Sequence, residues 1–280
     1  MARSAAPEPG HDGESVQPAP RSALVVAHPG HELRLYHWLE LNRPRVHVLT
    51  DGSGSASRSR LDSTRALLAR AGAAPGAIFG RWSDRELYRA LLAGDAAPFH
   101  ALAEELAAEL QEEGVDLVVG DAVEGYNPGH DAFRLVLNAA VRELGRQTGR
   151  RIGNYEFPLV AAPDQGADDP ACVRLRLDPA ALARKLAAAR AYSEVAGEVE
   201  RALARNGEQA FATEILRPVD YGLEIAGLFA GPPHYEEVGE ERRRRGVYRE
   251  VIRLREHLLP LAADLDHPHR PAIARRGAGA

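Results

Sequence analysis

Short apolar runs alternate with amphipathic stretches over the first half of the chain. The apolar runs predict buried strands at 23–27, 45–49, 76–80 and 115–120. The stretches between them carry apolar positions at helical spacing and predict helices at 31–41, 60–71, 84–92, 98–113 and 132–144. Strands that alternate with helices are typical of an α/β fold, in which a mostly parallel sheet is covered by helices on both faces.

The pattern is weaker beyond residue 150. We expect strands at 151–159 and 172–177, an Ala-rich helix over 179–206 and a helix over 240–259. Glutamates surround the arginines at 242–245, which favours a solvated, salt-bridged face over an anion site. Both ends lack a periodic apolar pattern, so we expect a single domain at 22–265 between flexible tails at 1–21 and 266–280.

Composition narrows the class of protein. The chain has 280 residues, 45% of them hydrophobic, and a formal charge of -5, which argues against a nucleic-acid binder that works by broad charge. No apolar run approaches the ~20 residues of a membrane span, and the start lacks the apolar block of a signal peptide. The single cysteine, Cys172, excludes an internal disulfide and a multi-thiolate metal site. We therefore expect a soluble, cytoplasmic globular protein, and the heavy Ala and Arg usage indicates a bacterial source.

Residues that bind ligands collect where three of the predicted strands end. In an open parallel sheet, ligands bind beyond the carboxyl ends of the strands. The first strand runs into His28 and His31, the second into Asp51, and the fourth into a loop that reaches His130. Imidazole is a good zinc ligand, and three protein ligands plus water make a catalytic zinc site. The spacing alone leaves a second interpretation open, because the chain has 11 histidines and two of them beside a turn occur often by chance.

Two motifs resemble those of the PIG-L/LmbE-like zinc-dependent N-deacetylases. Segment 27–32 is Ala-His-Pro-Gly-His-Glu, where that family usually has Ala-His-Pro-Asp-Asp-Glu, and 127–130 is Asn-Pro-Gly-His in place of His-Pro-Asp-His. The resemblance is good over 22–145 and loose over the rest. It implies a Rossmann-like fold, a zinc ion held by two histidines and one aspartate, and hydrolysis of an N-acyl group, commonly an acetyl group on an amino sugar.

The resemblance also implies roles for single residues. His28 and His130 match the two histidine ligands, and His31 stands where the family has its ligand aspartate. Gly30 occupies the position of the general-base aspartate, so the proton-handling group is changed. Three neutral histidines leave the full charge on zinc, and such a site brings the pKa of its bound water near 7, so less help from a protein base is needed.

Other residues of the same sheet edge are candidates for the missing functions. Asn127 replaces the histidine that assists at the oxyanion, and we expect Asn127 or the Tyr126 hydroxyl to donate a hydrogen bond there. Asp131 is the first candidate to replace the lost carboxylate, as a partner that orients a ligand or as a base. Further carboxylates on this edge are Asp51, Asp121 and Glu124.

The sequence thus predicts a zinc-dependent hydrolase that cleaves an N-acyl bond of an amino sugar or a related small polar metabolite. Two alternatives remain open at this point. Three histidines with open positions also suit iron, copper or nickel, which allows a different metal-dependent reaction. A non-catalytic protein that binds a carbohydrate or a partner on the same scaffold is the other alternative.

Overall fold

A computed structural model of the chain describes residues 20–54, 58–166, 168–220 and 225–266. Its strands form one seven-stranded sheet in the order β3-β2-β1-β4-β5-β7-β6, in which β7 runs antiparallel to both of its neighbours and the five strands from β3 to β5 are parallel. The predicted mostly parallel α/β sheet is therefore confirmed. The strands are β1 (Ser22–Val26), β2 (Arg45–Thr50), β3 (Ala74–Trp82), β4 (Leu117–Asp121), β5 (Gly153–Phe157), β6 (Val173–Arg176) and β7 (Thr213–Pro218).

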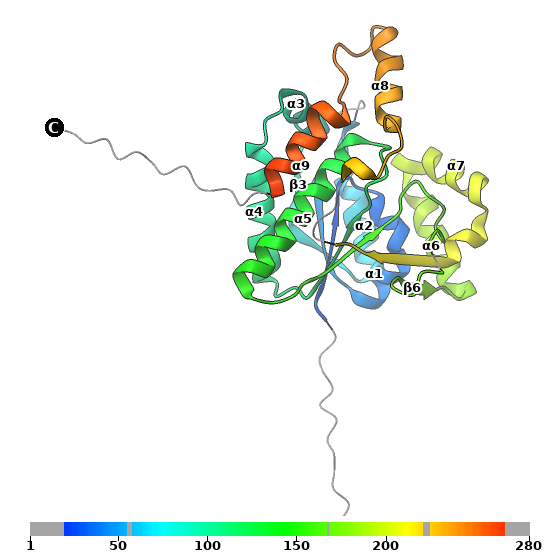
Figure 1. Cartoon of the computed structure of the whole chain (residues 1–280). Coiled ribbons are helices and arrows are strands. Elements are labelled where there is room, and N and C mark those ends of the chain that lie inside the picture. Colours follow the sequence, from blue (N-terminus) through cyan, green and yellow to red (C-terminus); the bar gives the residue numbers. More distant parts are fainter. Residues whose placement is uncertain (1–19, 55–57, 167, 221–224, 267–280) are drawn as a thin grey trace, which may run out of the picture.

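Helices cover both faces of this sheet (Figure 1). Side chains alternate along β1, so that Val25 joins one apolar cluster with α3, α4, α5 and α9, and Leu24 joins another with α1, α2 and α6. The α-helices are α1 (Tyr36–Asn42), α2 (Leu61–Ala71), α3 (Asp84–Ala93), α4 (Ala97–Glu112), α5 (Pro128–Thr148), α6 (Pro179–Ala191), α7 (Ala196–Asn206), α8 (His234–Arg244) and α9 (Leu259–Asp266). Shorter helical turns are η1 (His31–Leu35), η3 (Ser193–Val195), η4 (Glu208–Ala212), η5 (Ile225–Gly227) and η6 (Leu254–Leu258).

Two predicted helices are interrupted. The helix expected over 179–206 breaks between α6 and α7, because the buried Tyr192 turns inward and its hydroxyl lies 2.9 Å from the Thr64 hydroxyl. The helix expected over 240–259 begins earlier, at His234, and ends at Arg244. Gly246 follows with a φ of 72°, which reverses the chain before η6. The strand β7 lies within a stretch where the pattern of hydrophobic positions predicts none.

A buried ion pair fastens α6 to the sheet. Lys185, the only lysine of the chain, lies 2.8 Å from Glu214 on β7, and both side chains are almost completely buried. The Glu214 carboxylate also accepts hydrogen bonds from the backbone amides of His37 and Trp38, at 3.0 and 2.8 Å. Lys185 Nζ donates to the Arg34 carbonyl at 2.7 Å. One pair of charges therefore joins α6, η1, α1 and β7.

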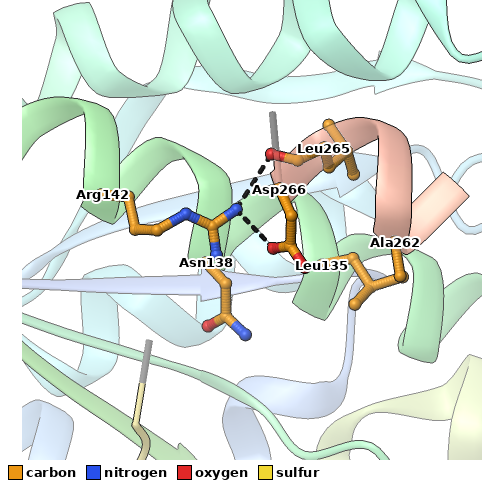
Figure 2. Close-up of a pocket in the computed structure, with 6 residues that line it drawn as sticks. All are labelled: Leu135, Asn138, Arg142, Ala262, Leu265 and Asp266. Carbon is orange, nitrogen blue, oxygen red and sulfur yellow. Dashed lines mark hydrogen bonds and ion pairs between the residues drawn. The ribbon is translucent and has the colours of Figure 1, made fainter. Parts of the chain in front are cut away.

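The last described helix is held against α5. Arg142 Nη2 lies 2.9 Å from both the Leu265 carbonyl and the Asp266 carboxylate (Figure 2). The predicted tails, 1–21 and 266–280, lie outside the described residues except for Pro20, Arg21 and Asp266. The single domain at 22–265 stays a prediction. No described helix is long and apolar enough to cross a membrane.

The arginine run at the end of α8 forms ion pairs as expected. Arg243 lies 3.0 Å from Glu240 and Arg244 lies 2.7 Å from Glu241, one helical turn earlier. The Arg242 guanidinium lies over the ring of Tyr248, 5.2 Å from its centre. The predicted salt-bridged face is confirmed for Arg243 and Arg244.

Candidate metal centre

Three histidines from two loops converge near the carboxyl ends of β1 and β4. His28 follows β1, His31 begins η1, and His130 lies in the first turn of α5, directly after the loop that follows β4. One ring nitrogen of each lies within 4.8 Å of the others. Because β1 and β4 are neighbours in the sheet, their carboxyl ends bring these loops side by side. The structure thus brings together the three histidines that the sequence singled out.

The His31 ring is fixed by a carboxylate. Its Nδ1 lies 2.8 Å from Asp121 Oδ2 at the end of β4, and the same oxygen accepts a hydrogen bond from the Ala27 amide at 2.8 Å. Burial lowers the pKa of His31, but the charge and hydrogen bond of Asp121 outweigh this effect and raise it. A ring that donates from Nδ1 keeps Nε2 free. In metal sites a carboxylate on the far nitrogen orients the ring in this way and makes it a stronger ligand.

The His28 ring has a second carboxylate partner. Its Nε2 lies 3.2 Å from Asp84 Oδ1 at the start of α3, and Asp84 Oδ2 accepts from the Gly54 amide at 2.6 Å. Burial raises the pKa of Asp84, but the interactions with His28 and Gly54 outweigh it and lower the pKa to about 2. His28 Nδ1 is buried and has no hydrogen-bond partner. A buried nitrogen without a partner is costly unless a ligand satisfies it.

His130 completes the cluster as a neutral imidazole. Burial and the two neighbouring histidines lower the pKa of His130 well below its usual range. Its ring centre lies 4.5 Å from that of His31 and 4.9 Å from that of His28. A neutral imidazole is the form that binds a metal ion. The donors therefore fit a divalent transition metal, because the His28 nitrogen lacks a partner and no described carboxylate belongs to the cluster.

The backbone at Gly30 disfavours the aspartate that the resemblance places there. Its φ is 105°, a conformation that side chains rarely adopt, and a Cβ atom would lie 3.3 Å from Val195 and 3.8 Å from the Tyr192 ring. The buried Glu32 fixes this turn, since its carboxylate accepts from the Gly30 amide at 2.8 Å and from the Thr64 hydroxyl at 2.7 Å. The wall beside Gly30 is therefore built from Tyr192 and Val195, at the break between α6 and α7.

The predicted carboxylates differ in their surroundings. Asp131 is completely buried, and its Oδ1 accepts from the Glu124 and Gly125 amides at 3.2 and 3.3 Å. Burial raises the pKa of Asp131 to about 7. Asp51 is half-buried directly after β2, and its Oδ1 accepts from the Ser53 amide at 2.9 Å. Asp131 thus holds the loop before α5, whereas Asp51 stands beside the end of β1.

The predicted oxyanion donors also differ. Asn127 caps α5, and its Oδ1 accepts from the Gly129 amide at 2.7 Å and from the Tyr88 hydroxyl at 3.2 Å. Two donors on the oxygen fix the orientation of the amide, and no described residue accepts a hydrogen bond from its Nδ2. Tyr126 is 50% exposed, and its ring is stacked on that of His234 with the centres 5.1 Å apart. Asn127 is therefore the better-anchored donor.

Glu124 holds a neighbouring loop. Its carboxylate accepts from three successive backbone amides, those of Leu159, Val160 and Ala161, at 2.8 to 2.9 Å. Arg34, three residues after His31, donates to the Leu159 and Ala161 carbonyls at 2.6 and 2.8 Å. Two opposite charges from the two histidine loops therefore anchor the segment after β5.

Asp84 is the residue of the site that the sequence analysis missed. The candidate ligands named from the sequence follow the first, second and fourth strands, beyond whose carboxyl ends ligands bind. Asp84 follows the third strand, β3, and its capped helix start at Ser83 was a usable signal. Asp121 was named only as a further carboxylate on the edge, and the structure places it against His31.

Comparisons with known proteins give structural likenesses only. No protein-family model matches the chain, and no curated protein matches it in sequence. The A40926 pseudoaglycone deacetylase Dbv21 is 15% identical with a TM-score of 0.47, covering 73% of this chain and 99% of its own. The zinc-inhibited teicoplanin deacetylase Orf2 is 12% identical (TM-score 0.47), and a deacetylase–teicoplanin complex is 14% identical (TM-score 0.48); each match covers 71% of this chain and 99% of the other. The matched structures are deacetylases, the class of enzyme that the sequence motifs resemble, but at these identities and TM-scores they assign no role to any residue here.

Proposed function

We propose that the protein is a metal-dependent hydrolase that cleaves an N-acyl bond of a small polar amine such as an amino sugar. The observation that carries this proposal is the convergence of three histidines. Buried carboxylates lie beside His28 and His31, and the other ring nitrogen of His28 is buried without a hydrogen-bond partner. His28, His31 and His130 would hold the ion, most simply zinc. Bound there, a zinc ion supplies Lewis acidity toward a carbonyl and lowers the pKa of a bound water.

Asp121 and Asp84 keep the site in order. Each fixes one imidazole ring by its far nitrogen, and both carboxylates are nearly inaccessible to water. A rigid ring keeps its free nitrogen aimed at the same point, so substrate and water meet a preformed site. Their negative charges also offset part of the charge that the all-histidine set leaves on the ion.

Asp51 is the proposed base. Its Oδ1 is held by the Ser53 amide, while no described residue donates to Oδ2, so one carboxylate oxygen is available for a proton. The Thr50 amide donates to the Ala27 carbonyl at 2.9 Å, which places Asp51 next to the chain that reaches His28. Asp131 is assigned a positioning role, because its carboxylate holds the loop that carries Tyr126 and Asn127.

Asn127 is the proposed donor to the oxyanion. Attack on an acyl carbon moves negative charge onto the carbonyl oxygen, and an aimed N–H stabilises that charge. The Asn127 amide is fixed by the Gly129 amide and the Tyr88 hydroxyl, so its Nδ2 needs no reorganisation during the reaction. Tyr126 then contributes, with His234, a stacked aromatic rim to the site.

The deciding experiment is metal analysis followed by an activity screen. Protein without a histidine tag should contain close to one zinc ion per chain, and His28→Ala with His130→Ala should contain none. A panel of N-acetylated sugars and amines, scored by free-amine release, should show activity that Asp51→Asn lowers at unchanged metal content. Absence of metal after reconstitution with zinc, iron, copper and nickel would refute the proposal.

The all-histidine donor set also favours one specific alternative. Because no described carboxylate belongs to the cluster, the site also accepts iron, copper or nickel, and a different metal-dependent reaction is the second candidate. The same analysis separates the two. Stoichiometric iron or copper in the purified protein, with no amide hydrolysis in the zinc-loaded form, would favour this alternative.

A further inference from the structure

A groove runs along the outer face of α3, beside the metal centre. It is widely open to solvent, has a volume of about 500 Å³ and is lined by Arg85, Tyr88, Arg89, Leu92, Ala93 and Glu250. The first five lie at successive turns on one side of α3, while Leu87 and Leu91 on the other side are buried in the core. Glu250 comes from the segment after α8, which passes beside α3 (Figure 1). The floor is therefore partly apolar, and its rim is charged.

The two arginines of this groove are exposed, and Arg89 interacts electrostatically with Glu86 on the same helix. Arg85 and Arg89 form no ion pair with any residue in the described ranges, whereas Arg243, Arg244 and Arg253 nearby are all paired. Like charges four residues apart on a helix repel one another. A cation in the first turn of a helix, such as Arg85, also opposes the helix dipole.

Both arginines are exposed, and the carboxylate that lies between them on α3 is held elsewhere. The nearest acid on the same helix, Glu86, has its carboxylate engaged by the amide and hydroxyl of Ser83 in a capping box. Two cations that repel one another above a partly apolar floor are relieved when an anion lies between them. The guanidinium group matches the geometry of a carboxylate with two parallel hydrogen bonds.

The groove is connected to the metal centre at two points. Asp84, the first residue of α3, lies 3.2 Å from His28, and the Tyr88 hydroxyl donates to Asn127 at the start of α5. Along a helix that rises 1.5 Å per residue, Arg89 lies about 7 Å and Leu92 about 12 Å beyond Asp84. One end of the groove therefore lies next to Asp84 and Tyr88, the two residues of α3 that contact His28 and Asn127.

We propose that this groove binds the part of the substrate that lies away from the scissile bond, an apolar or aromatic group that carries a carboxylate. The ring or chain packs on Tyr88, Leu92 and Ala93, and the carboxylate lies between Arg85 and Arg89. Glu250, on the opposite wall, disfavours a second negative charge. The assignment of the ligand as substrate rests on the proposed function, but binding by the groove does not require the metal.

The test compares the binding of two compounds, 4-phenylbutyrate and 4-phenylbutanol, which has an uncharged hydroxyl in place of the carboxylate. Binding is measured by ligand-detected NMR and by calorimetry. The full chain should bind the carboxylate at least fivefold more tightly than the alcohol. The double variant Arg85→Gln/Arg89→Gln should abolish this difference and leave the affinity for the alcohol unchanged. Glu250→Gln should tighten the binding of the carboxylate, and Arg65→Gln, an exposed arginine on α2, should change neither affinity.

The outcomes separate the groove from the metal centre. His28→Ala/His130→Ala, which lacks the metal, should bind phenylbutyrate as the wild type does, so the groove is tested even if the hydrolase proposal fails. Equal affinities for the two compounds in the wild type would overturn the proposal. So would an unchanged preference for the carboxylate in the double arginine variant. In the active enzyme, the same double variant should raise KM for N-acetyl substrates with a distal carboxylate and leave kcat within twofold.

Discussion

The charge of Asp121 should decide how tightly the metal is held. Asp121→Asn keeps the shape of the side chain and one oxygen that can accept from His31 Nδ1 and the Ala27 amide, both now at 2.8 Å. The substitution therefore removes the charge while it preserves the orientation of the ring. Carboxylates behind a ligand histidine are typically worth 10- to 100-fold in metal affinity.

The structure places the expected loss in the lower part of this range. Because the hydrogen bonds persist, we expect zinc affinity to fall by about tenfold, or ~1.4 kcal/mol. Asp121→Ala loses orientation as well as charge and should approach a hundredfold loss. Asp121 Oδ1 is buried without a partner, so the new amide nitrogen of Asn at that place should also lower the stability of the metal-free protein by about 1–3 kcal/mol.

The assay is competition for zinc with a chromophoric chelator at fixed pH and ionic strength, with urea unfolding of the metal-free forms beside it. Asp62→Asn, which removes a fully exposed carboxylate on α2, is the control. It should leave zinc affinity unchanged and lower stability only slightly, because its ion pair with Arg65 is exposed to solvent. The reasoning is wrong if Asp121→Asn binds zinc as tightly as the wild type while His28→Ala no longer binds zinc. In that case the charge of Asp121 does not affect zinc affinity.

Three further predictions concern stability. Lys185→Met leaves Glu214 buried without its cation and should lower the free energy of unfolding in urea by about 3–5 kcal/mol. Adding Glu214→Gln should recover part of this loss. A double variant no more stable than the single one would contradict the pairing. Gly30→Ala should lower the free energy of unfolding by about 1–2 kcal/mol because of the positive φ at this position. The loss should exceed that of Gly94→Ala, because nothing lies within 4 Å of a Cβ atom at Gly94. Equal losses would show that Val195 and Tyr192 move to make room for the added methyl group. Since burial raises the pKa of Asp131 from 3.8 to about 7, its folded form holds the proton more tightly than its unfolded form. The contribution of Asp131 to the stability of the metal-free protein is therefore fullest below pH 3.8 and is lost as the pH rises through about 7. Unfolding curves taken across that range should show the wild type losing stability relative to Asp131→Asn as the pH rises.

The first half of the fold follows from local patterns. The expected strand at 45–49 and helix at 84–92 agree with β2 and α3 within one residue. Buried parallel strands are continuous apolar runs, and their helices carry a regular apolar stripe, so both signals are local. The three histidines were found for the same reason, because each stands directly after or near the end of such a strand.

The second half depends on contacts that no local pattern contains. Tyr192 interrupts an Ala-rich helix because its hydroxyl reaches Thr64 and the Arg60 carbonyl, more than 120 residues earlier in the chain. The roles of Asp84 and Asp121 are fixed in the same manner, by distances to His28 and His31 that only the folded sheet creates. Sequence reasoning names such residues as polar and well placed, but it does not assign them partners.

The buried Lys185 gives the protein a built-in reporter of its own opening. It is the only lysine side chain in 280 residues and is inaccessible behind Glu214 in the folded state. An amine-directed acylating reagent can therefore modify this side chain only when α6 separates from β7. The rate of that single modification, followed by mass spectrometry, would measure how often the wall formed by α6 and Tyr192 detaches beside the metal centre, without any engineered label.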